Sequence, residues 1–184
     1  MRNDVIEGKW VEAFEQALRL CAVKPGQVVA ILSETQSRAI NVKLAELALD
    51  RLGARAFHIV IPTPRQTAPV PVRSTGASDA IQRIGPVVDA LAASDMIVDL
   101  TVEGTMHAPE TVELRAKGAR LYYISNEHPE ILERLRPDPE MKDRVRRTFE
   151  VISAAREMHV TSEAGTDLTV TLDGAMVGRG NVGW

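Results

Sequence analysis

The sequence has 184 residues, of which 45% are hydrophobic and only 4% aromatic, and its net charge at pH 7 is −3. This composition predicts a globular protein with an aliphatic core and argues against a nucleic-acid partner, which would require a basic stripe. The single cysteine, Cys21, excludes an internal disulfide and fits a cytoplasmic protein. No apolar run approaches the ~20 residues that a membrane helix requires, so no membrane partner is expected.

Amphipathic stretches and short apolar runs alternate along the first 156 residues. The helix face formed by Trp10, Phe14 and Leu18 is one example of the helical period. Asp79 is expected to cap the third helix, and Pro86 to kink it. Helices are predicted at about 5–22, 36–52, 79–93, 109–117, 129–135 and 140–156, and strands at 27–33, 54–62, 96–101 and 120–125.

This alternation predicts an α/β fold, in which an open, mostly parallel sheet carries helices on both faces. Ligands of such folds bind beyond the carboxyl ends of the strands. Residues 62–78 contain four prolines, Pro62, Pro64, Pro69 and Pro71, and are expected to form a long extended loop between the second strand and the third helix.

The pattern changes near residue 156, since residues 158–163 and 167–173 alternate as strands do. We therefore predict an α/β domain at 1–156 and, at 157–184, the start of an incomplete β-rich catalytic domain. So short a unit cannot bury its own core, and it is expected to pack on the α/β domain, on another copy or on another chain.

The last residues include Gly178, Gly180 and Gly183, which have the glycine spacing of a dinucleotide-binding loop. That motif follows the first strand of a sheet and leads into a helix, with an acidic residue ~20 positions later. Neither the helix nor the acid follows here. We interpret the stretch as a flexible or tightly turning loop, so no nucleotide cofactor is expected.

Among the four histidines, His107 has the most informative position. It lies shortly after the predicted strand 96–101 and just before a helix, where α/β folds place ligand contacts. His58 is predicted to be core or pocket wall, His128 to lie on the surface at a helix start, and His159 to lie in a strand. A carboxylate from Asp99 or Glu103 could orient the His107 ring, although Asp99 could equally bind loop amides.

No histidines, cysteines or carboxylates have metal-ligand spacing, and no serine stands in a nucleophile motif. Cys21 lies on an apolar helix face and is interpreted as a structural thiol. The residues alone identify no catalytic group and no metal ligand.

Three stretches, at 10–32, 94–110 and 132–168, resemble the aminopeptidase-T-like metallohydrolases. The last contains the segment His159-Val160-Thr161-Ser162-Glu163-Ala164-Gly165-Thr166-Asp167-Leu168, which in that family joins the α/β domain to a β-rich domain. The similarity is greatest to a branch that degrades small aromatic acids. That branch includes 5-nitroanthranilic acid aminohydrolase, the closest in likeness, and 2,5-dihydroxypyridine 5,6-dioxygenase.

The resemblance implies a chain about twice as long, with its metal ligands in the other half. It implies a divalent transition metal (Mn, Fe, Zn or Co), a small aromatic acid substrate and a homo-oligomer. His107-Ala108-Pro109-Glu110 matches a His-Ser-Pro-Glu stretch that carries a pocket histidine, so His107 is expected to contact the substrate. The C-terminal fragment of the same protein, beginning after Trp184, is the expected partner.

The leading hypothesis is therefore a metal-dependent hydrolase that removes an aromatic amino group with a metal-activated water. The alternatives are an iron-dependent dioxygenase that cleaves a dihydroxypyridine-type ring, and a metallo-aminopeptidase. A non-enzymatic α/β interaction domain stays open as a different class.

Overall fold

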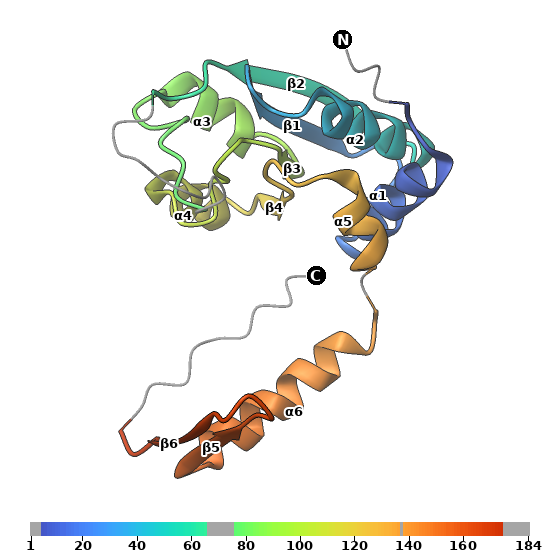
Figure 1. The fold of residues 1–184 in the computed structure, drawn as a ribbon. Coiled ribbons are helices and arrows are strands. Elements are labelled where there is room, and N and C mark those ends of the chain that lie inside the picture. Colours follow the sequence, from blue (N-terminus) through green and yellow to red (C-terminus); the bar gives the residue numbers. More distant parts are fainter. Residues whose placement is uncertain (1–4, 66–75, 137, 175–184) are drawn as a thin grey trace. The chain divides into compact units, whose positions relative to one another are not determined.

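The structure is a computed structural model, and it describes residues 5–65, 76–136 and 138–174 (Figure 1). The chain divides into two compact units, 1–137 and 138–184. The first contains the helices and strands α1 (Gly8–Leu20), β1 (Val28–Glu34), α2 (Ala39–Arg51), β2 (Arg55–Ile61), α3 (Gly85–Ala92), β3 (Met96–Asp99), α4 (Pro109–Ala116), β4 (Arg120–Tyr123) and α5 (Pro129–Arg134).

The four strands of the first unit form one parallel sheet with the order β2-β1-β3-β4. Chain order reverses between β1 and β3, because the chain first adds β2 on one side of β1 and then crosses over to add β3 on the other. Leu32 of β1 lies opposite Asp99 of β3 in the register. The carboxyl ends of these two strands therefore meet at the point where such sheets bind ligands.

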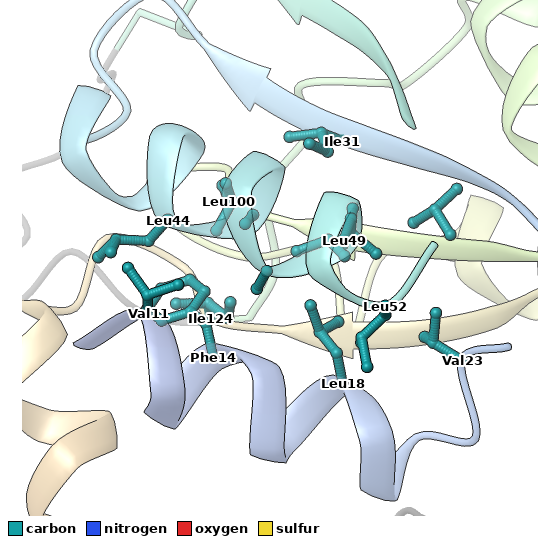
Figure 2. Packing of buried hydrophobic residues seen from close by; sticks show 14 of the residues in the cluster. Val11, Phe14, Leu18, Val23, Ile31, Leu44, Leu49, Leu52, Leu100 and Ile124 are labelled. Atoms are coloured by element: carbon teal, nitrogen blue, oxygen red, sulfur yellow. The ribbon is translucent and has the colours of Figure 1, made fainter. Parts of the chain in front are cut away.

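Two hydrophobic clusters cover the two faces of the sheet, because alternate residues of a strand point to opposite sides. On β1, Val29 and Ile31 join the cluster with α1 and α2, whereas Ala30 and Leu32 join the cluster with α3 and α4. Figure 2 shows the first cluster, to which α1 contributes Phe14, α2 contributes Leu44 and β1 contributes Ile31. The predicted α/β fold, with helices on both faces of a parallel sheet, is confirmed.

Helix α3 differs from its prediction at its start. It begins at Gly85 rather than at Asp79, and Pro86 occupies its first turn instead of kinking it. A proline is tolerated there because the first amides of a helix have no partner within it. Arg83, with φ of +60°, is not in helical conformation and separates the turn at 79–82 from the helix.

The second unit contains α6 (Met141–Ala154) and an antiparallel hairpin of β5 (Glu157–Thr161) and β6 (Asp167–Thr171). The unit begins before α6, whereas the sequence analysis placed α6 in the first domain and the boundary at 156. That 157–184 begins a β-rich catalytic domain stays a prediction. The glycines of the terminal stretch 178–184 lie outside the described residues.

Among the described residues, none of the helices combines the length and the apolar character that crossing a membrane requires.

Candidate functional site

The candidate site is built from the loops that follow the parallel strands. Glu34 ends β1 and Asp99 ends β3, so two carboxyl groups stand at the reversal point of the sheet. Both side chains are buried, with 3% of Glu34 and 0% of Asp99 exposed. Buried carboxyl groups require partners, and their partners define the geometry of the surrounding loops.

Asp99 organises the loop after β3. One of its oxygens accepts hydrogen bonds from the backbone amide and the hydroxyl of Thr101, at 2.9 and 2.6 Å. The other accepts from the amide and the hydroxyl of Thr105, both at 2.7 Å. The hydroxyl of Thr111, in α4, then donates to the carbonyl of Thr105 at 2.6 Å. Asp99 therefore binds loop amides, the second of the two roles considered for it, and its four bonds tie the loop to the helix that follows.

His107 stands at the end of this organised loop, with its side chain exposed. Its backbone amide donates to the carbonyl of Gly76 at 2.5 Å, and the Gly76 amide donates to the carbonyl of Glu103 at 2.6 Å. Of its two neighbours in the chain, Ala108 is buried, with 3% exposed, and leads into α4, whereas Met106 is 49% exposed. The imidazole is thus accessible, while the backbone amide of His107 is held by Gly76, which is itself held by Glu103.

Glu34 anchors a different part of the same edge. The Ser78 hydroxyl donates to its Oε1 at 3.3 Å, and the same hydroxyl accepts from the Ala80 amide at 3.1 Å. Its Oε2 is buried and makes no hydrogen bond of normal geometry within the described part of the chain. Burial raises the pKa of Glu34, the nearby charge of Asp99 adds to that rise, and polar contacts from Thr63, Val102 and Ser78 offset part of it.

The loop after β1 is tied by hydrogen bonds to the loops after β3 and β4. The Ser37 hydroxyl donates to the carbonyl of Leu100 at 2.6 Å and accepts from the Glu34 amide at 2.8 Å. The Arg38 amide donates to the Asn126 side chain at 3.1 Å. The loops after β1, β3 and β4 therefore form one connected edge above the sheet.

The other three histidines lie apart from this edge or serve local structure. His58 is exposed on the edge strand β2, so its prediction as core was wrong. His128 is exposed and caps α5 by accepting from the Glu130 amide at 3.3 Å, as its position predicted. His159 pairs with Asp167 at 2.6 Å across the hairpin, and both side chains are exposed.

The described residues contain no cluster of three or more histidine, cysteine, aspartate or glutamate side chains that could hold a metal. Burial raises the pKa of the Cys21 thiol to about 11, so the thiol is protonated at neutral pH, which agrees with its interpretation as a structural residue.

Glu34, Gly76 and Ser78 were not predicted from the sequence. The rule that singled out His107 also covers Glu34, because it is the last residue of a buried strand at the sheet's carboxyl edge. No sequence pattern indicated Gly76 or Ser78. They lie at the end of the proline-rich stretch 62–78 and contact the loop after β3 and the end of β1 only in the folded protein.

Residues 9–184 match the family NicX, described as 2,5-dihydroxypyridine 5,6-dioxygenase. The chain belongs to this family. A curated 2,5-dihydroxypyridine 5,6-dioxygenase of Pseudomonas putida KT2440 is 29% identical over 170 residues, which are 91% of this chain and 48% of that protein. A solved structure of 2,5-dihydroxypyridine dioxygenase from Pseudomonas putida KT2440 superposes with a TM-score of 0.75 at 30% identity, covering 91% of this chain and 48% of that one.

The chain spans about half the length of these relatives. A solved structure of Klebsiella oxytoca NpsA in complex with 3-hydroxyanthranilyl-AMSN has a TM-score of 0.39 and 17% identity, covering 71% of this chain and 20% of that one, and carries no argument here.

The family match corrects the functional hypothesis. Membership in a dioxygenase family contradicts the expected metal-dependent hydrolase that removes an amino group, and it does not support the aminopeptidase-T-like assignment. It favours the ring-cleaving dioxygenase, which was the stated alternative. The physical reason for the error is that the stretches carrying the resemblance form helices and strands of the scaffold, among them α1, β3 and α6, and a scaffold does not specify the chemistry it supports.

We predict that Asp99→Asn destabilises the protein and loosens the loop after β3. The amide of asparagine cannot accept at both oxygen positions, so donors from Thr101 or Thr105 lose their acceptor, at about 1–3 kcal/mol for each group left unsatisfied. Urea unfolding should report the loss, and hydrogen exchange at these two amides should accelerate. The control Asp89→Asn removes an exposed carboxylate 3.5 Å from Lys117 and should cost less than about 1 kcal/mol. Equal effects for the two variants would contradict the role of Asp99.

We predict that Glu34→Gln gains stability relative to the wild type as pH rises. A carboxyl group with a raised pKa binds its proton more tightly in the folded state, so its contribution to stability falls as pH rises from the unfolded value, about 4.3, through the folded one. The variant lacks this loss. The difference in unfolding free energy, variant minus wild type, should therefore increase between about pH 4 and pH 8, measured by urea unfolding.

Glu46→Gln provides a control of opposite sign. A hydrogen bond from Lys43 lowers the pKa of Glu46, so this carboxylate contributes stability above its unfolded pKa, and the corresponding difference should fall slightly as pH rises. A flat or falling difference for Glu34→Gln would contradict burial of an uncompensated carboxyl group.

Proposed function

We propose that this chain is the N-terminal part of an iron-dependent dioxygenase that cleaves the ring of a dihydroxypyridine-type substrate. The observation that carries the proposal is the family match over residues 9–184, which includes the whole described sheet and its carboxyl edge. The relatives carry the name 2,5-dihydroxypyridine 5,6-dioxygenase. The proposal gives this chain the same reaction class, with both atoms of O₂ entering the opened ring.

We propose that His107 contacts the substrate. Its exposed imidazole stands at the carboxyl edge of β3, beside the reversal point of the sheet, which is where ligands bind in folds of this kind. An imidazole can accept a proton from a ring hydroxyl or donate a hydrogen bond to it near neutral pH. The Asp99 network supports this role, because it fixes the loop that presents the imidazole.

We propose that the metal is held by residues beyond those of this chain. The described residues do not fit a metal ion, since they contain no group of three or more candidate ligands. When bound, iron would supply the redox chemistry with O₂. The residues of this half would bind and orient the substrate and exchange a proton with it.

The partners are proposed on the same grounds. The relatives are about twice as long as this chain, which supports a partner segment that carries the metal, with a small aromatic acid as the substrate class. A second polypeptide beginning after Trp184 and a homo-oligomer stay predictions. Intact mass spectrometry and light scattering of the purified material test them.

The reaction class is tested by following O₂ uptake and substrate consumption together. We predict that the full-length protein loaded with Fe(II) consumes one O₂ for each 2,5-dihydroxypyridine, and that no substrate is consumed under anaerobic conditions. A solution containing iron without protein is the control. Substrate turnover without O₂ uptake would contradict the proposal.

We predict that His107→Ala lowers kcat at least tenfold, the scale of a lost acid–base or hydrogen-bonding group, while the iron content of the protein stays unchanged. His58→Ala is the matched control, because His58 is also exposed but lies on the edge strand β2. It should leave kcat unchanged. Wild-type turnover by His107→Ala would remove His107 from the substrate site without affecting the assignment of the reaction class.

A further inference from the structure

We infer that Gly76 is a positioning residue for His107, and that the absence of a side chain at position 76 sets the orientation of the imidazole. The inference rests on the proposed function, since it concerns how His107 is presented to a substrate. Gly76 meets the loop after β3 at Glu103 and His107, and it comes from a part of the chain that the sequence gives no reason to connect with that loop.

The contact between Gly76 and the ring is close. A Cβ built on Gly76 would lie 3.0 Å from Cδ2 and 3.5 Å from Nε2 of His107, and 3.4 Å from Cβ of Met106. The φ angle of Gly76 is +70°, which side-chain-bearing residues rarely adopt. A side chain at this position would therefore strain the backbone and also push the imidazole away from its present place.

The backbone of Gly76 cannot shift easily, because hydrogen bonds hold the segment 76–78 in place. Its amide and carbonyl bond to Glu103 and His107, and the Ser78 amide donates to the carbonyl of Gly104 at 2.8 Å. The Ser78 hydroxyl is bound in turn to the buried Glu34 carboxyl group at 3.3 Å. Hydrogen bonds thus fix the backbone beside the imidazole to both the loop after β3 and the end of β1.

A second glycine brings in the loop after β4. A Cβ on Gly104, whose φ is +78°, would lie 2.6 Å from the Ser125 hydroxyl oxygen and 3.5 Å from the Gly76 Cα. Ser125 therefore lies beside Gly104, Gly104 beside Gly76, and Gly76 beside His107. Three loops thus surround the imidazole, and at Gly76 and Gly104 a side chain would require neighbouring atoms to shift.

The test is a double-mutant cycle in the full-length, iron-loaded protein with 2,5-dihydroxypyridine. Gly76→Ala should lower kcat at least fivefold in the wild-type background and by less than twofold when His107 is already alanine, because a positioning effect requires the group being positioned. An undiminished effect in the His107→Ala background would overturn the inference. An activity of Gly76→Ala equal to that of the control variant, Gly118→Ala, would also overturn the inference.

The control is Gly118→Ala. Gly118 has φ of +90° with nothing within 4 Å of an added Cβ, so this variant carries the backbone strain without the contact. If Gly76→Ala fails to fold while Gly118→Ala folds, the double variant Gly76→Ala/His107→Ala should recover folding, because the clashing ring is gone. Failure of the double variant to recover would count against the contact.

A spectroscopic readout separates this inference from the proposed function. The ring-proton NMR signals of His107 should shift in Gly76→Ala and stay unchanged in Gly118→Ala, whatever the reaction. If His107→Ala proves fully active, the substrate role fails while shifted signals still support the positioning. Unshifted His107 signals in Gly76→Ala would overturn the positioning itself.

Discussion

The candidate site depends on one buried carboxylate. Asp99 ends β3 inside the protein, and its two oxygens take four hydrogen bonds from Thr101 and Thr105. Leaving such a group unpaired inside a protein is costly, so the loop must curl over the strand end to supply its donors. The same curl delivers His107 to the surface and starts α4 at Pro109, which lacks the amide that a first helical turn would leave unpaired.

The topology of the sheet determines where that loop lies. In the order β2-β1-β3-β4 the strand order reverses between β1 and β3, so the helices that follow these two strands pack on opposite faces of the sheet. Glu34 ends β1 and Asp99 ends β3 at this reversal point. Asp99 is satisfied by its own loop, whereas Glu34 holds Ser78 with one oxygen and leaves the other without a normal hydrogen bond among the described residues. The two carboxyl groups are chemically alike and differ in the hydrogen-bond donors that the surrounding loops provide.

Much of the scaffold could be predicted from the sequence, because local patterns determine it. The run around Val29 and Ile31 is apolar and β-branched, which predicts a buried strand, and the spacing of Trp10, Phe14 and Leu18 predicts the buried face of α1. His107 was singled out as a candidate by a rule about strand ends that requires only the order of helices and strands. The start of α3 was misplaced, because Asp79 has the chemistry of a cap and the left-handed conformation of Arg83 is not visible in a sequence.

The contacts that shape the site were beyond the sequence. Gly76 meets His107 and Ser78 meets Glu34 only after the sheet has assembled, and no periodicity links residues so far apart. The reaction class was also misjudged, since the resemblance depended on segments that form the scaffold, whereas the described residues hold no metal cluster that would distinguish a hydrolase from a dioxygenase. The family match over nearly the whole chain corrected the class.

The central claim is that the edge organised by Asp99 presents His107 to the substrate. A crystal structure of the full-length, iron-loaded protein with 2,5-dihydroxypyridine bound without O₂ tests it most directly. The account predicts a His107 ring nitrogen within ~2.6–3.2 Å of a polar atom of the substrate, with the ring lying against Gly76. A substrate bound out of reach of His107, with the imidazole turned to solvent, would contradict it.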